Sequence, residues 1–128
     1  MYSIILLGSD YMDLKKDDSI FEGLVLELRR GTIILSVLSQ LKKPQYGYSL
    51  AVLLEKKGIN VDAGTLYPLL RRLEKQGILS SNWDVESTKP RKYYELSNYG
   101  EAIYKKLCKQ WISMTESMNK LINGDGVK

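Results

Sequence analysis

Hydrophobic residues recur at helical spacing in four stretches of the chain, which are separated by glycine, proline or polar segments. The first stretch, residues 19–41, opens with a capping box formed by Ser19 and Glu22, and its apolar series continues on both sides of Gly31. Because glycine costs about 1 kcal/mol in a helix interior, the pattern predicts either one helix kinked at Gly31 or two abutting helices. The stretch ends before Pro44, since the residue preceding a proline avoids the helical conformation.

Two shorter amphipathic segments follow. Residues 46–57 carry leucines on one face and stop at a glycine, and residues 63–76 start after Asp62, a suitable N-cap, and stop at another glycine. Only residues 58–62 lie between them. Two short helices joined by a tight glycine-containing turn form a helix-turn-helix, so this motif is predicted here.

After Gly77 the pattern changes to alternation with a period of two. Residues 78–85 and 91–96 predict two strands that a polar segment joins as a hairpin, which turns a helix-turn-helix into a winged one. In the second strand, alternation places Leu96 and Tyr94 toward the core, and Arg91 and Tyr93 away from it.

The last segment, residues 98–122, follows Ser97 as an N-cap and carries a heptad-like apolar seam. The seam is too short for a free coiled coil, and the apolar face is wider than one small domain covers, so a partner helix is expected. We therefore predict a homodimer. Its predicted interface residues are Ile20, Leu24, Tyr104, Leu107, Trp111, Met114, Met118 and Leu121.

The fold class predicted from these elements is mainly α with a small β-hairpin. With 128 residues, 44% of them apolar, the chain has the size of one domain. Residues 19–96 are expected to form the winged helix-turn-helix and residues 97–122 the dimerisation helix. Residues 1–18 are expected to be a disordered or artefactual leader, and residues 123–128 a frayed tail.

Composition argues against catalysis. The chain has no histidine and one cysteine, so the usual general base, the commonest metal ligand and paired thiolates are missing. No glycine-rich phosphate loop lies between a strand and a helix, and we expect no cofactor, no metal and no enzyme activity. The single Cys108 forms no internal disulfide, which favours the cytoplasm, and no apolar stretch reaches the roughly 20 residues of a membrane span.

The positive charge of the chain is small overall but is concentrated in one segment. The net charge is only +4, but six cations fall within residues 71–92. In the helix of residues 63–76, small and basic residues lie opposite the leucines, a face suited to the major groove, and the backbone N–H groups at its start would contact phosphate. The alternative is a solubilising face. Basic residues in the hairpin favour DNA over the second hypothesis, a winged-helix module that docks proteins and never binds DNA.

Three runs of residues also carry a specific pattern: Tyr46-Gly47-Tyr48, Gly64–Glu74 and Pro90–Leu96, together with Gly77 and Trp83. Over residues 26–122 the chain resembles the PadR family of winged-helix regulators, in its short-tailed branch with a single helix after the wing. The resemblance implies a dimeric repressor on a palindromic double-stranded DNA operator, whose final helix packs against the partner's N-terminal helix. Residues expected to contact DNA are Tyr46, Tyr48, Gly64, Thr65, Tyr67, Pro68, Arg71, Arg72, Lys75, Lys89, Arg91, Lys92 and Tyr93.

Two features qualify the resemblance. The family's wing is often glycine-rich, whereas residues 86–90 here contain none and Asp84 is acidic, so backbone contact is expected rather than insertion into a groove. In multidrug-responsive members, two indoles at the position of Trp111 flank a pocket for flat aromatic compounds. Trp111 is therefore a candidate site for a small planar aromatic ligand, the alternative being an anchor of the dimer interface.

Overall fold

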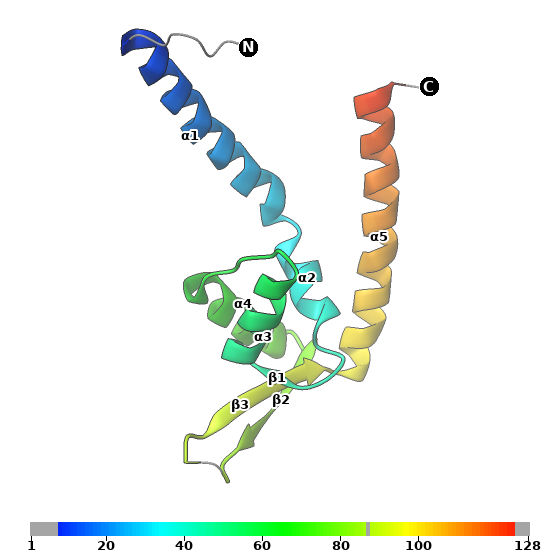
Figure 1. Ribbon diagram of the computed structural model, residues 1–128. Helices are drawn as coiled ribbons and strands as arrows, with labels where there is room; N and C mark the ends of the chain where they lie inside the picture. Colours follow the sequence, from blue (N-terminus) through cyan, green and yellow to red (C-terminus); the bar gives the residue numbers. More distant parts are fainter. Residues whose placement is uncertain (1–7, 87, 125–128) are drawn as a thin grey trace. The chain divides into compact units, whose positions relative to one another are not determined.

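The computed structural model describes residues 8–86 and 88–124, and confirms the predicted fold class: mainly helical, with a small antiparallel sheet (Figure 1). The chain divides into two compact units, one containing α1 and one running from Ile34 onward. The elements are α1 (Gly8–Arg30), α2 (Ile33–Ser39), β1 (Gln45–Tyr46), α3 (Gly47–Lys56), α4 (Ala63–Lys75), β2 (Leu79–Asp84), β3 (Arg91–Leu96) and α5 (Asn98–Asn123). No described helix is long and apolar enough to cross a membrane.

Helix α1 begins earlier than the sequence pattern indicated. The capping box placed its start at Ser19, but the helix begins at Gly8, so residues 8–18 are helical rather than a disordered leader. No proline interrupts this segment, and an existing helix gains one hydrogen bond for each residue that it adds, which allows it to extend past a local capping signal. Residues 1–7 of the expected leader, and residues 125–128 of the expected tail, lie outside the described residues.

The long first segment is two abutting helices, one of the two predicted alternatives. Between α1 and α2 lie Gly31 and Thr32, and Thr32 donates from both its N–H and its hydroxyl to the carbonyl of Arg29, at 2.9 and 2.8 Å. Helix α2 ends at Ser39, but the chain continues in a tight turn that keeps Leu41 buried and presents its carbonyl to the N–H of Leu96 at 2.8 Å.

The core of the second unit is formed by one face of each of α2, α3 and α4 together with the sheet. Helices α3 and α4 end before Gly58 and Gly77, as predicted. Helices α2, α3 and α4, the turn after α2 and the sheet together bury eleven hydrophobic side chains: Val37, Leu38, Leu41, Leu50, Leu54, Leu66, Leu70, Leu73, Leu79, Tyr94 and Leu96. The core therefore holds the helix-turn-helix and the base of the hairpin as one body.

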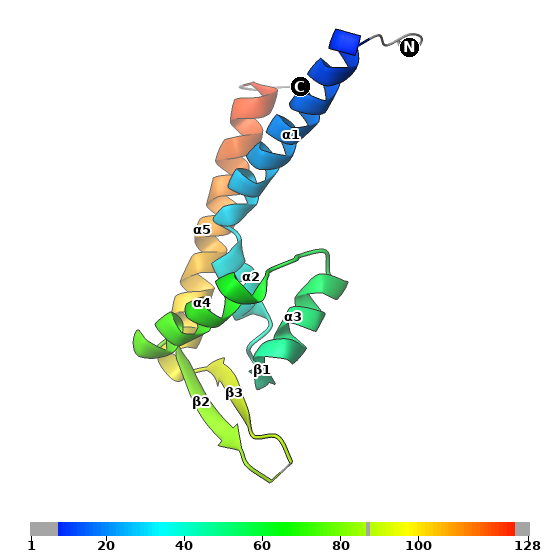
Figure 2. The same cartoon turned by 90° about the vertical axis from the view of Figure 1, so that its left-hand side faces the viewer.

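The sheet contains a strand that the sequence did not predict. Its order is β1-β3-β2, all antiparallel, and β1 pairs Gln45 with Tyr94 and Tyr46 with Tyr93. Tyr46 was assigned to the following helix, but it is extended and forms the N-cap of α3. A strand of two residues is too short to show alternation, which explains the error. The β2–β3 hairpin projects beyond the helices in both views (Figures 1 and 2).

Helix α5 is fixed to the winged helix at its first turn. The Ser97 hydroxyl accepts a hydrogen bond from the Gly100 N–H at 2.9 Å, which confirms the predicted cap. Ser97 also donates its N–H to the Ile78 carbonyl at 3.0 Å, and its hydroxyl lies 2.6 Å from the Gly77 carbonyl. The turn that ends α4 is thereby joined directly to the start of α5.

Candidate nucleic-acid interface

Helix α4 presents the face that the sequence predicted. Leu66, Leu70 and Leu73 are buried, whereas the opposite side is open to solvent. The predicted DNA contacts on this exposed side are Gly64, Thr65, Tyr67, Pro68, Arg71, Arg72 and Lys75. An exposed helix face with small residues at its start and cations further along has the dimensions and charge to enter a major groove.

The start of α4 carries a negative charge of its own. Asp62 is the N-cap residue, as predicted, but its carboxylate accepts a hydrogen bond from the Thr65 hydroxyl at 2.8 Å and makes no side-chain bond to the first-turn backbone. A carboxylate at a helix N-terminus complements the helix dipole and repels a second anion. The expected phosphate contact at this helix start stays a prediction, now with Asp62 opposing it.

Four cations surround an open cleft of about 490 Å³ between α4 and the wing. It is lined by Arg71, Arg72 and Lys75 of α4, by Lys92 of β3, and by one acidic residue, Glu74. Residues predicted separately from the helix and from the hairpin thus lie on one surface. Such a concentration of positive charge attracts phosphate groups.

Glu74 ties the wing to α4 within this cleft. Its Oε1 lies 2.9 Å from Lys92 Nζ, and its Oε2 accepts a hydrogen bond from the Ser81 hydroxyl of β2. The hydrogen bond from Ser81, followed by that from Lys92, lowers the pKa of Glu74, and the hydrogen bond to Glu74 raises the pKa of Lys92. Both groups are therefore charged at neutral pH.

A second cluster lies on the opposite face of β3. The Arg91 guanidinium sits 4.6 Å from the centre of the Tyr46 ring, and that ring meets Tyr93 edge-on with centroids 5.3 Å apart. Tyr48, 66% exposed, lies beside Tyr46 at a centroid distance of 6.5 Å. Alternation explains the division, because Arg91 and Tyr93 point away from the core, whereas Tyr94, the residue after Tyr93, is buried, as predicted.

Tyr67 links the two helices of the helix-turn-helix. A Cβ on Gly47, the first residue of α3, would lie 2.1 Å from Cε1 of the Tyr67 ring. Only glycine at position 47 therefore allows this close packing. Tyr67 is still 39% exposed, so the ring can pack on α3 and also present an edge at the surface.

The remaining predicted DNA contact, Lys89, is exposed in the connection between β2 and β3, apart from the residues that line the cleft. Two residues outside the predicted DNA contacts join the wing to α4: Glu74, which lines the cleft, and Ser81 of β2, which donates a hydrogen bond to Glu74. Glu74 lies 7 residues from Ser81 and 18 from Lys92 along the chain, so no local pattern could have paired them.

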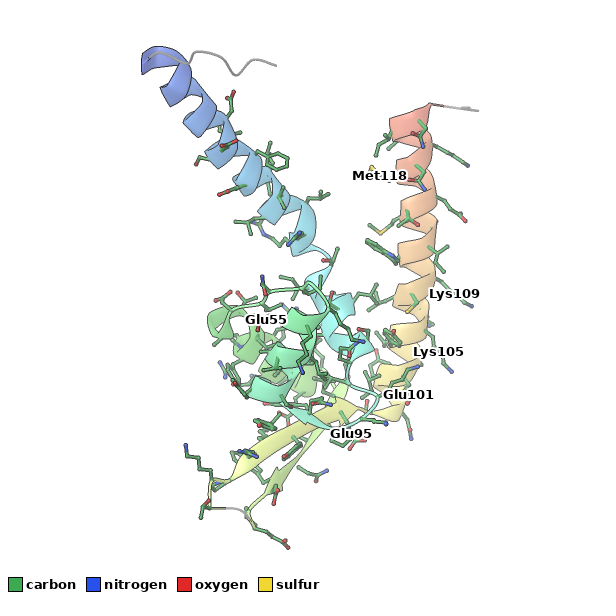
Figure 3. The ribbon with its side chains drawn as sticks, in the orientation of Figure 1. Glu55, Glu95, Glu101, Lys105, Lys109 and Met118 are labelled. Atoms are coloured by element: carbon green, nitrogen blue, oxygen red, sulfur yellow. The ribbon has the colours of Figure 1, made fainter. Side chains whose placement is uncertain are left out.

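The predicted dimerisation surface is apolar and exposed in the single chain. On α5, Tyr104 and Leu107 are half-buried, and exposure rises to 43% at Trp111 and 77% at Leu121. Figure 3 shows Lys105 and Lys109 on one side of α5 and Met118 on the other. Met114 belongs to the same exposed seam, and Ile20 and Leu24 of α1 are also more than half exposed.

These elements define a winged helix-turn-helix protein with one further helix after the wing. The chain belongs to the transcriptional regulator PadR-like family, whose model matches residues 34–106. It is accordingly a transcriptional regulator and not an enzyme, as predicted.

Two solved structures of transcriptional regulators and one further protein are similar to this chain. A PadR family transcriptional regulator from Eggerthella lenta DSM 2243 is 45% identical, with a TM-score of 0.83; the match covers 87% of this chain and 99% of that one. A transcriptional regulator from Clostridium thermocellum is 32% identical, with a TM-score of 0.67 and coverage of 73% and 96%. A protein of Lysinibacillus sphaericus described as uncharacterized is 30% identical over 97 residues, which are 73% of this chain and 87% of that protein.

Proposed function

We propose that this regulator is a sequence-specific repressor that binds a palindromic double-stranded DNA operator as a homodimer. The observation that carries the proposal is the cleft in which Arg71, Arg72, Lys75 and Lys92 meet beside the exposed face of α4. A protein-docking winged helix has no need of four cations on one surface, whereas a recognition helix in the major groove uses arginines for guanine edges and lysines for phosphates.

The roles of the cations differ by position. Arg71 lies on the exposed face of α4, three residues after Pro68, where a helix lying in the groove brings side chains to base edges. Lys75 and Lys92 lie at the end of the helix and at the wing, where the DNA backbone would pass. We assign base readout to Arg71 and phosphate contact to Lys75, and to Lys92 only when it leaves its ion pair with Glu74.

The exposed seam of α5 supports dimerisation. The apolar side chains from Trp111 to Leu121 are exposed in the single chain, as is typical of interaction surfaces, and a palindromic operator requires two recognition helices related by a two-fold axis. We propose that α5 packs against the partner's α5 and α1. Trp111 then lies near the two-fold axis, where it and its mate can stack on a small planar aromatic ligand that relieves repression.

The test uses fluorescence anisotropy with the full-length protein, a random duplex and the sequence protected by the protein upstream of its own gene. Affinity for both duplexes should fall steeply with salt, since phosphate contacts release counterions. Arg71→Ala should cost about 1–3 kcal/mol on the protected site and relax the preference for it. Lys109→Ala removes one cation from the polar side of α5 and serves as the matched control.

The outcomes are distinct. If neither duplex binds, DNA recognition is refuted. If Arg71→Ala binds the protected site as tightly as Lys109→Ala does, Arg71 has no part in base readout, although DNA binding itself stands.

A further inference from the structure

Each oxygen of the Glu74 carboxylate has its own donor. Lys92 Nζ lies 2.9 Å from Oε1, and the Ser81 hydroxyl donates to Oε2, so the carboxylate bridges β3 and β2 from α4. The side chains of Lys92 and Glu74 are 29% and 33% exposed. The pair therefore lies at the rim of the cleft, where a phosphate can reach it, and not in the core.

A carboxylate offers a lysine the same kind of partner as a phosphate does: an anionic oxygen that accepts a charge-assisted hydrogen bond. Lys92 already has such a partner inside the protein. To bind DNA, it must exchange the Glu74 oxygen for a phosphate oxygen or share itself between the two. Among the described residues that line the cleft, Glu74 is the one acidic side chain, and it lies beside Arg71, Arg72 and Lys75.

We propose that Glu74 competes with DNA phosphate for Lys92 and thereby sets the absolute affinity for DNA. The competition weakens binding to DNA of every sequence by the same factor and leaves base readout by Arg71 unchanged. The ratio of operator affinity to non-specific affinity is therefore the same with and without this competition. The inference rests on the DNA binding proposed above and adds the control of its sequence-independent part.

The proposal predicts the direction and the size of the change in DNA affinity. Glu74→Gln keeps the shape of the side chain, removes its charge and releases Lys92 for one additional phosphate contact. The slope of log affinity against log salt should then steepen by about 0.9, the value for one phosphate on double-stranded DNA. The gain in affinity should accordingly shrink about 3.5-fold between about 50 and 200 mM salt. A purely structural role, in which Glu74 positions Lys92 for phosphate, predicts the opposite sign.

The experiment measures random-duplex affinity across salt for wild type, Glu74→Gln, Lys92→Gln and the double variant. We expect Glu74→Gln to bind more tightly with the steeper slope, Lys92→Gln to differ little from wild type, and the double variant to match Lys92→Gln. Glu101→Gln removes one exposed carboxylate from the start of α5 and controls for net charge (Figure 3).

Weaker or unchanged binding by Glu74→Gln overturns the proposal. So does a gain that persists in the double variant, or an equal gain in Glu101→Gln, because then general charge and not Lys92 accounts for it. Absence of binding by the wild type instead refutes the proposed function. Circular dichroism of each variant verifies the fold, and the Lys92→Gln arm tests the proposal even if Glu74→Gln does not fold.

Discussion

Gly100, in the first turn of α5, determines how the C-terminal helix joins the winged helix. A Cβ at this buried position would lie 1.9 Å from the carbonyl oxygen of Ile78 and 3.2 Å from Cδ2 of Leu96. Close carbon–oxygen contacts in proteins are about 3.3–3.6 Å, so Gly100→Ala must move α5 and the Ile78 carbonyl apart by roughly 1.5 Å. The atoms that must move therefore belong to the backbone and not to a flexible side chain.

The size of the effect follows from what this displacement breaks. The bond from the Ser97 N–H to the Ile78 carbonyl, now 3.0 Å, is the first to be lost, at a net cost of about 0.5–1.5 kcal/mol. Overpacking adds about 1–3 kcal/mol, and the higher helix propensity of alanine offsets up to about 1 kcal/mol. The free energy of unfolding should therefore fall by about 2 kcal/mol.

Urea unfolding followed by circular dichroism measures this, at one protein concentration because association shifts apparent stability. Gly31→Ala, between α1 and α2, is the matched control, since a Cβ there meets nothing within 4 Å and Gly31 has no positive φ. That variant should be as stable as wild type or more stable by up to about 1 kcal/mol. Equal stability of Gly100→Ala and Gly31→Ala would refute the steric argument.

Two further predictions concern the exposed seam of α5. Met114→Asp should dissociate or unfold the dimer in sedimentation velocity, because a buried unpaired charge costs several kcal/mol. Ser113→Asp puts the same charge about 100° further round the helix, outside the seam, and should leave the dimer intact. A monomeric wild type at micromolar concentration would contradict this. Planar aromatic dyes should quench the fluorescence of Trp111 saturably, and Trp111→Ala protein that remains dimeric should bind them less tightly. Trp83 in the wing reports non-specific quenching, and equal dye affinity in both proteins would leave Trp111 as a packing residue.

Much of the fold could be predicted because its boundaries carry local chemical signals. Ser97 caps α5, glycines end α3 and α4, and the strand from Arg91 to Leu96 has the predicted bounds. The errors lie where no such signal exists. Strand β1 is formed by pairing with a strand more than forty residues away, and the early start of α1 depends on helix propagation rather than on a cap.

The candidate site could be predicted in its residues but not in its connections. Helical periodicity placed Arg71 and Lys75 on the exposed face, and alternation separated Arg91 from Tyr94. The same alternation puts Arg91 and Lys92 on opposite faces of β3, although both are among the predicted DNA contacts of the hairpin. Their partners, Tyr46 and Glu74, are distant in the sequence, so the division of the wing into two differently anchored cations required the structure.

The attachment of α5 at Ser97 also affects DNA recognition, because a small rotation there moves the far end of this long helix by a much larger distance. The distance from Ser97 to Met118 along the helix is about 32 Å at 1.5 Å per residue, so a rotation of about 5° at the anchor displaces the seam by nearly 3 Å. A dimer that holds two recognition helices about 34 Å apart, one turn of DNA, tolerates little displacement of this kind. Helix α4 meets the anchor directly, since Ser97 binds the Gly77 and Ile78 carbonyls immediately after it. Gly100→Ala should therefore weaken operator binding by dimers well beyond its effect on random DNA.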